Sequence, residues 1–136
     1  IPIVINNCLQ NKSFKLSHCN QYRDFIYIDD VINVIIKMLK IKKTNGEIFN
    51  LGTGKPIKLK TVINKIRIHI KGGKPIYGIK KLRKDEIYKI YPNIEKIKKI
   101  IKWFPKISID SGLLKTINYQ RNKSKKPLNI NQVRKN

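Results

Sequence analysis

The stretch Arg23-Asp24-Phe25-Ile26-Tyr27-Ile28-Asp29-Asp30-Val31 decides the fold of this chain. Aromatic and β-branched residues over 22–28 predict a strand. Asp29 and Asp30 then offer a side-chain cap and negative charge to a helix predicted over 31–41, whose apolar residues cover more than one face. A strand that leads directly into a buried helix indicates an α/β fold.

A second informative stretch is Ile48-Phe49-Asn50-Leu51-Gly52-Thr53-Gly54. Its short apolar run predicts a buried parallel strand over 48–51. The two glycines allow either a close approach to a ligand or merely a tight turn. The third glycine of a dinucleotide-binding loop is missing, and so is the acidic residue about 20 positions later, so we do not expect the cofactor here.

Further elements follow from apolar spacing and turn residues. We expect a helix end at 3–10, strands at 14–17 and 75–79, and helices at 59–70, 94–102 and 108–121. The folded part is therefore one domain over 1–121. Residues 122–136 have too few apolar groups to pack and are expected to form a basic, disordered tail.

The charge of +23 favours an anionic partner such as nucleic acid, but composition offers another cause. Ile, Lys and Asn supply 67 of the 136 residues, which is typical of an AT-rich genome. Lysines outnumber arginines 26 to 5, whereas readers of phosphates and bases favour Arg. A small basic nucleic-acid-binding domain remains the alternative function.

Several other classes are disfavoured by the sequence. Cys8 and Cys19 have no zinc-site spacing with His18 or His69, so we expect no metal and two reduced thiols. Lysines interrupt every apolar run, so no membrane span is expected. The chain opens on Ile1 without a basic leader, which we interpret as a fragment of a cytoplasmic protein.

Arginine is scarce enough here for its positions to be informative. Arg23 stands at the start of the first stretch, and Arg83 lies in Leu82-Arg83-Lys84-Asp85-Glu86. Each provides a planar fork that binds phosphate or carboxylate through two hydrogen bonds. The alternative is that Arg23 pairs with Asp24 or another carboxylate and that Arg83 is merely solvated.

In order and spacing, the motifs resemble the extended short-chain dehydrogenase/reductase family, in its nucleotide-sugar epimerase and dehydratase branch. The family's R-D-(F/Y/W)-x-(Y/H)-V-x-D, Y-N-(L/I)-G-x-G, R-x-x-(E/D) and D-x-x-K-x-x-x-x-L-G-W segments are similar to 23–30, 49–54, 83–86 and 93–103. A final helix matches 108–119. The pattern departs at Asn93, usually Asp, and at Lys102, usually Gly.

The resemblance implies roles for particular residues. Arg23 and Arg83 match the arginines that clamp the diphosphate of the nucleotide-sugar. Asn50 is expected to brace its turn. The segments that contact the nucleotide base in the family correspond here to Lys15, Leu16, Ser17, Lys58 and Leu59.

The resemblance also implies a longer protein. The family's NAD- or NADP-binding loop and its catalytic Tyr-x-x-x-Lys pair would lie upstream, and hydride transfer there gives a 4-keto sugar. This chain would be the C-terminal substrate-binding lobe of a homodimeric enzyme. Its helix at 31–41 and strand at 48–51 would belong to the missing Rossmann domain. A non-catalytic relative is a further alternative.

Overall fold

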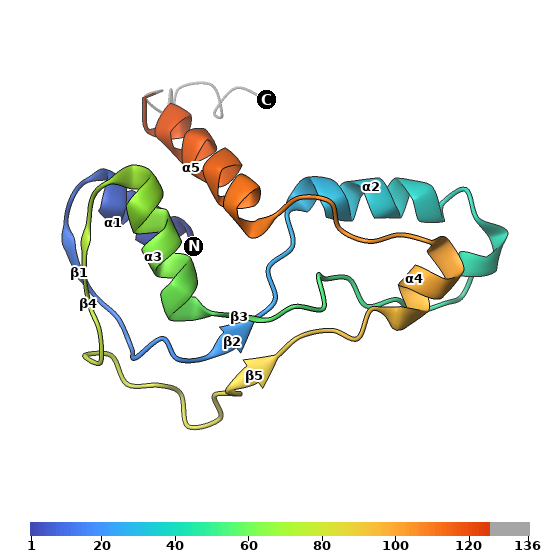
Figure 1. Ribbon diagram of the computed structural model, residues 1–136, viewed down its shortest axis with the longest axis horizontal. Helices are drawn as coiled ribbons and strands as arrows, with labels where there is room; N and C mark the ends of the chain where they lie inside the picture. The colour runs from blue at the N-terminus through green and yellow to red at the C-terminus, as the bar shows by residue number, and fades with distance from the viewer. Residues whose placement is uncertain (126–136) are drawn as a thin grey trace, which may run out of the picture.

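The computed structural model describes residues 1–125, in which helices are joined by short strands (Figure 1). Helices α1 (Pro2–Leu9), α3 (Leu59–Ile70) and α5 (Ile109–Lys125) pack against one another. Helices α2 (Ile28–Met38) and α4 (Glu95–Ile101) lie at the other end of the molecule. All the predicted helices are present, with boundaries shifted by a few residues.

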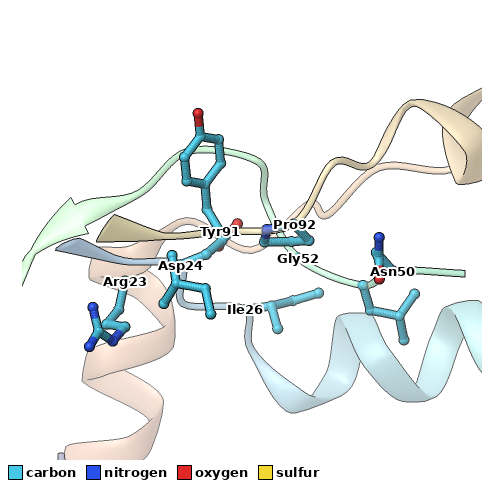
Figure 2. Close-up of a pocket in the computed structure, with 9 residues that line it drawn as sticks. Arg23, Asp24, Ile26, Asn50, Gly52, Tyr91 and Pro92 are labelled. Atoms are coloured by element: carbon cyan, nitrogen blue, oxygen red, sulfur yellow. The ribbon is translucent and has the colours of Figure 1, made fainter. Parts of the chain in front are cut away.

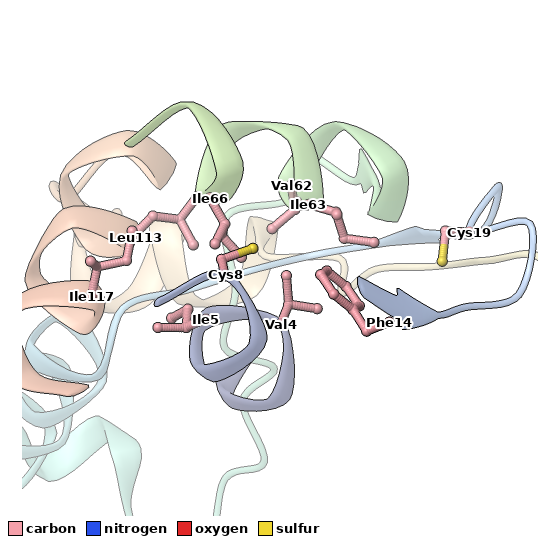
Figure 3. Close-up of a cluster of buried hydrophobic side chains, with 10 residues drawn as sticks. All are labelled: Val4, Ile5, Cys8, Phe14, Cys19, Val62, Ile63, Ile66, Leu113 and Ile117. Atoms are coloured by element: carbon pink, nitrogen blue, oxygen red, sulfur yellow. The ribbon is translucent and has the colours of Figure 1, made fainter. Parts of the chain in front are cut away.

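Helices α1, α3 and α5 bury a shared apolar cluster together with β1 (Figure 3). Its members recur at three- and four-residue intervals along each helix, which is the spacing of one helical face. The cluster comprises Val4, Ile5, Cys8, Phe14, Cys19, Val62, Ile63, Ile66, Leu113 and Ile117. Both cysteines are free thiols. Burial raises the pKa of the Cys8 thiol, so it stays protonated at neutral pH.

Two small sheets connect the helices. In the first, β1 (Ser13–Lys15) runs parallel to β4 (Lys74–Ile76), close to the strands predicted at 14–17 and 75–79. In the second, the central strand β2 (Tyr22–Arg23) lies antiparallel to β3 (Ile57–Lys58) and parallel to β5 (Lys89–Ile90). The sequence did not predict β3 and β5, because two-residue strands are too short to show alternation.

The predicted strand over 22–28 is wrong beyond Arg23. Strand β2 ends there, and Ile28 already begins α2. Asp29 and Asp30 lie in the first turn of α2, but neither side chain caps the helix as predicted. Each has another partner instead: Asp29 pairs with Lys115 at 3.1 Å, and the buried Asp30 accepts backbone N–H groups from the linker before α5.

A second apolar cluster joins α2 to α4. It consists of Val34, Ile94, Ile97, Ile101 and Trp103. The side chain of Asn93 accepts the N–H of Glu95 at 2.9 Å, as expected for the residue that opens this helix. The short 3-10 helix η1 (Lys42–Thr44) then follows α2.

The strand predicted over 48–51 is not formed in the described structure. Ile48 is 84% exposed, and no other strand within residues 1–125 pairs with this segment. The outward face of α2 is also apolar and open, as shown by Ile28, Ile32, Ile35, Ile36 and Leu39. The prediction failed because a buried parallel strand needs neighbours on both edges, which the described residues do not supply.

Helix α5 continues to Lys125, four residues beyond the expected end of the folded part at 121. Lys, Arg and Gln are good helix formers, so a polar sequence can extend a helix whose first turns are packed. Residues 126–136 of the expected tail lie outside the described residues. No helix within residues 1–125 is long and apolar enough to cross a membrane.

Candidate functional site

A cavity of about 500 Å³ lies where three segments of the chain meet. Its walls come from β2 and the residues after it, from the segment before the glycine turn, and from β5 and the residues after it. The lining residues are Arg23, Asp24, Ile26, Asn50, Leu51, Gly52, Ile90, Tyr91 and Pro92. Figure 2 shows Arg23 at one end of this row and Asn50 at the other. We call it the Arg23 cavity, and its volume is typical of small-molecule sites.

Arg23 supplies the positive charge of this cavity. Its Nη1 donates to the carbonyl oxygen of Tyr22 at 2.7 Å, and its Nη2 donates to the carboxylate of Glu86 in an ion pair. Both side chains are about three-quarters shielded from water. The pair joins β2 to a segment 63 residues further along the chain. It therefore restrains the guanidinium of a residue that lines the cavity.

Arg83 reaches the same region through Glu86. The N–H of Glu86 donates to the carbonyl oxygen of Arg83 at 3.2 Å, so the two residues share one tight turn. The side chain of Arg83 is exposed and does not line the Arg23 cavity. The sequence alternative in which Arg23 pairs with a carboxylate is realised with Glu86, not with Asp24. That both arginines bind one diphosphate remains a prediction.

Asp24 holds the glycine turn in place. Its carboxylate accepts the N–H groups of Thr53 and Gly54 at 2.9 and 2.7 Å and the hydroxyl of Thr53 at 2.6 Å. The turn is also packed from the other side: a Cβ at Gly52 would lie 2.3 Å from Cγ of Pro92. Only glycine fits there, because the neighbouring chain approaches its backbone so closely.

The glycine turn does not fit a dinucleotide. A cofactor loop presents free backbone N–H groups to the pyrophosphate. Here Asp24 takes two of them, and Pro92 fills the space beside Gly52. Among residues 1–125, moreover, no three His, Cys, Asp or Glu residues are grouped to hold a metal ion.

The residues expected to contact a nucleotide base form two groups. Lys15 ends β1, and Leu16 exchanges backbone hydrogen bonds with Ile76, Ile79 and Lys80 at 2.8 to 3.0 Å. The hydroxyl of Ser17 lies 3.7 Å from the Cys19 thiol. These contacts fix the shape of the segment but leave its function untested.

The second group opens α3. Lys58 pairs with Tyr22 across β2 and β3, and the N–H of Leu59 donates to the carbonyl oxygen of Gln21 at 2.9 Å. The segment 19–22 thus connects this group to Lys15, Leu16 and Ser17. None of the five residues lines the Arg23 cavity.

Sequence reasoning missed part of the site. Ile26, Ile90, Tyr91 and Pro92 line the Arg23 cavity, but the sequence pattern assigned them no role in binding. Glu86 was quoted within the Arg-x-x-Glu segment without a role. One signal was available, because the Arg-x-x-Glu segment places a carboxylate near Arg83 that can pair with another arginine.

A family model described as GDP-mannose 4,6 dehydratase matches residues 1–116. The chain belongs to this family. The family is one of the NAD-dependent epimerases and dehydratases, so the resemblance drawn from the motifs is confirmed. The predicted α/β fold class is confirmed too, because solved members superimpose on most of the chain.

Three relatives illustrate the match. CDP-abequose synthase of Salmonella muenchen is 34% identical over 86% of this chain and 40% of its own length. The UDP-glucose 4-epimerase of Thermotoga maritima, solved with UDP-glucose, superimposes with a TM-score of 0.81 at 25% identity, over 90% of this chain and 39% of its own. The UDP-glucuronic acid 4-epimerase of Bacillus cereus, solved with UDP-glucuronic acid and NAD, gives 0.78 at 24%, over 88% and 38%.

This member of the family therefore spans about 40% of the length of the relatives it matches. The candidate site that this chain does contain is the Arg23 cavity with the Glu86 turn beside it.

Proposed function

We propose that this chain is the nucleotide-sugar-binding part of an NAD- or NADP-dependent epimerase or dehydratase. The observation that supports it most is Arg23, which occupies the family's clamp position and lies at the edge of a ligand-sized cavity. The similar Thermotoga maritima and Bacillus cereus enzymes were solved with UDP-sugars, which makes a sugar nucleotide the fitting class of ligand.

Arg23 binds the diphosphate by exchanging one anion for another. In the described structure its Nη2 is occupied by Glu86. A diphosphate oxygen is an equally good acceptor for the planar guanidinium and carries more charge. The ligand therefore competes with Glu86 for Arg23. Arg83 lies in the same turn as Glu86, so its side chain can bind the same diphosphate.

The sugar lies in the Arg23 cavity, and the base lies toward α3. Tyr91, Pro92 and Ile26 give the cavity an apolar wall for the sugar ring, while Asn50 offers an amide at its far end. Lys15, Leu16, Ser17, Lys58 and Leu59 form the base-binding surface, largely through backbone groups. Such contacts favour no particular base by their side chains.

The hydride chemistry belongs to the whole protein. A nicotinamide cofactor held by other parts of the whole protein would supply hydride-transfer chemistry at the sugar ring. The residues of this chain bind and orient the nucleotide-sugar and exclude water from one side of it. We further propose that the whole enzyme is a homodimer in the cytoplasm.

Calorimetric titration of the full-length protein with UDP-glucose, dTDP-glucose, CDP-glucose and GDP-mannose tests the proposal. We expect at least one to bind, and Arg23→Ala or Arg83→Ala to weaken it by about 1.5 to 3 kcal/mol, the range for a hydrogen bond to a charged group. Arg121→Ala, on the exposed side of α5, is the matched control. Equal affinity in Arg23→Ala and Arg121→Ala would refute the site.

A further inference from the structure

A second cavity, of about 680 Å³, is lined in part by chain neighbours of the residues that line the Arg23 cavity. Its walls come from the chain on both sides of β3, from α4, and from the linker between α4 and α5. The lining residues are Phe25, Thr53, Lys55, Pro56, Ile57, Ile94, Lys98, Phe104, Pro105, Lys106, Ile107, Ser108 and Ile109. We call it the lysine cavity. No assigned role of the chain uses it.

The two cavities have no lining residue in common, although chain neighbours are divided between them. Asp24 and Ile26 line the Arg23 cavity, whereas Phe25 between them lines the lysine cavity. Gly52 and Thr53 are divided between the cavities in the same way. Successive side chains of an extended segment point to opposite faces, so each segment presents one residue to each side. A ligand in the lysine cavity would therefore occupy a separate site.

The charge of the lysine cavity has one sign. Lys55, Lys98 and Lys106 line it, and no acidic residue does so among those described. The ammonium groups of Lys55 and Lys106 have no hydrogen bond or ion pair within residues 1–125, whereas Lys98 pairs with the exposed Glu95 at 2.8 Å. Unpaired like charges around a hollow attract an anion.

The floor of the lysine cavity is apolar. Phe25, Ile57, Ile94 and Ile109 contribute aromatic and branched side chains, and Phe104 stands at 62% exposure on the wall. The exposed ring of Phe104 beside the free lysines offers apolar surface that the body of a ligand can cover. A small inorganic ion such as phosphate would pair with the lysines but would leave the apolar floor exposed to water.

We propose that the lysine cavity binds a small organic anion with an aromatic or branched aliphatic body, at a site separate from the Arg23 cavity. The anionic group pairs with Lys55 and Lys106, and the body covers Phe104 and the floor. A volume of about 680 Å³ is within the range that encloses molecules of this size. Because Asp24 and Phe25 are neighbours, the occupant stiffens the wall that both cavities share.

The test is a titration of the full-length protein with 1-naphthalenesulfonate and with uncharged 1-naphthalenemethanol. We expect one sulfonate to bind per chain and the alcohol to bind at least about tenfold more weakly, since it lacks the charged partner. Lys55→Gln with Lys106→Gln, and separately Phe104→Ser, should each weaken the sulfonate about tenfold. Lys43→Gln with Lys74→Gln, which removes two lysines outside the cavity, should change it less than twofold.

Amide NMR shifts supply the second measurement. The sulfonate should move the signals of Lys106 and Ile107 and leave those of Ile90 and Tyr91 in the Arg23 cavity unchanged. UDP should not displace it. Unchanged binding in the Lys55/Lys106 variant, or sulfonate shifts confined to the Arg23 cavity, would overturn the proposal even where nucleotide-sugar binding itself holds.

Discussion

At the scale of single residues, Asp30 shows how one carboxylate can fix a loop around a site. It is only 2% exposed, and it accepts the N–H of Ile107 at 2.9 Å and that of Lys106 at about 3.1 Å. These bonds hold the α4–α5 linker, which forms one wall of the lysine cavity. A buried carboxylate with such partners stabilises the fold because its lone pairs are satisfied by backbone groups.

We predict that Asp30→Asn lowers the free energy of unfolding of the full-length protein by about 1 to 3 kcal/mol. The amide keeps the shape but turns charge-assisted bonds into neutral ones, or places an N–H against an N–H. Urea denaturation measures the loss. Asp85→Asn, which changes an exposed residue without a described side-chain contact, should lie within about 0.5 kcal/mol of the parent.

Gly52 carries a second prediction at this scale. Gly52→Ala places a Cβ 2.3 Å from Pro92 Cγ and 2.9 Å from the Asp24 carboxylate. The chain must separate there, so we expect a loss of about 1 to 3 kcal/mol in urea denaturation and weaker nucleotide-sugar binding. Pro92→Ala in the same background should recover part of the loss. If the losses of unfolding free energy of Gly52→Ala and Pro92→Ala simply added in the double variant, the contact between residues 52 and 92 would not be the cause.

At the scale of elements, the ion pair that joins α3 to α5 depends on the carboxylate of Asp110. Lys65 Nζ donates to both oxygens of Asp110 at 2.8 and 2.9 Å, and His69 Nε2 lies 3.7 Å from it. The hydrogen bond from Lys65 is the main cause that lowers the pKa of Asp110 below its usual value. Asp110 also lies in the first turn of α5, where negative charge favours the helix.

This lowered pKa predicts a pH dependence. Because the folded state holds Asp110 ionised more strongly than the unfolded chain does, its contribution is present above an ordinary Asp pKa of about 4 and is lost as pH falls further. Between pH 5.5 and pH 2.5, Asp110→Asn should therefore lose less unfolding free energy than the parent. Asp85→Asn should follow the parent. If the unfolding free energy of Asp110→Asn changed with pH in parallel with that of the parent, the proposed contribution of the Lys65–Asp110 ion pair would be contradicted.

The same elements show what a sequence can predict here. The helices were found because apolar residues repeat on each at helical spacing, as at Val62, Ile63 and Ile66. The strands of the second sheet were misjudged because their hydrogen-bond partners are distant: β2 pairs with β5, which follows it by some 65 residues. The Arg23–Glu86 pair was beyond prediction for the same reason, although Arg23 itself was singled out.

At the scale of the whole molecule, the open apolar face is the main feature. Ile32, Ile35 and Ile36 are each nearly half exposed, and Leu39 and Ile48 more than four-fifths. Val34, on the opposite side of α2, is fully buried against α4. Relatives extend well beyond the part that this chain matches, and we propose that further protein of that kind covers the face.

The last prediction follows from that face. Burial of a large apolar side chain is worth about 1.5 to 3 kcal/mol, so leaving three of them nearly half exposed and two mostly exposed forgoes roughly 5 kcal/mol or more. That is comparable to the 5 to 15 kcal/mol that stabilises an ordinary domain. Residues 1–136 produced alone should therefore melt without a cooperative transition or aggregate, as followed by circular dichroism and light scattering.

Substitutions separate this cause from the high charge of the chain. Gln at Ile32, Ile35, Ile36 and Leu39 removes the apolar face, and we expect it to reduce aggregation of residues 1–136 strongly. Gln at Lys12, Lys43, Lys74 and Lys99 lowers the net charge by four from +23 and leaves the face intact, so it should not reduce aggregation. In the full-length protein the first set should instead be destabilising if, as proposed, further protein buries the same side chains. Cooperative, monomeric melting of unmodified residues 1–136 would show that the face needs no cover.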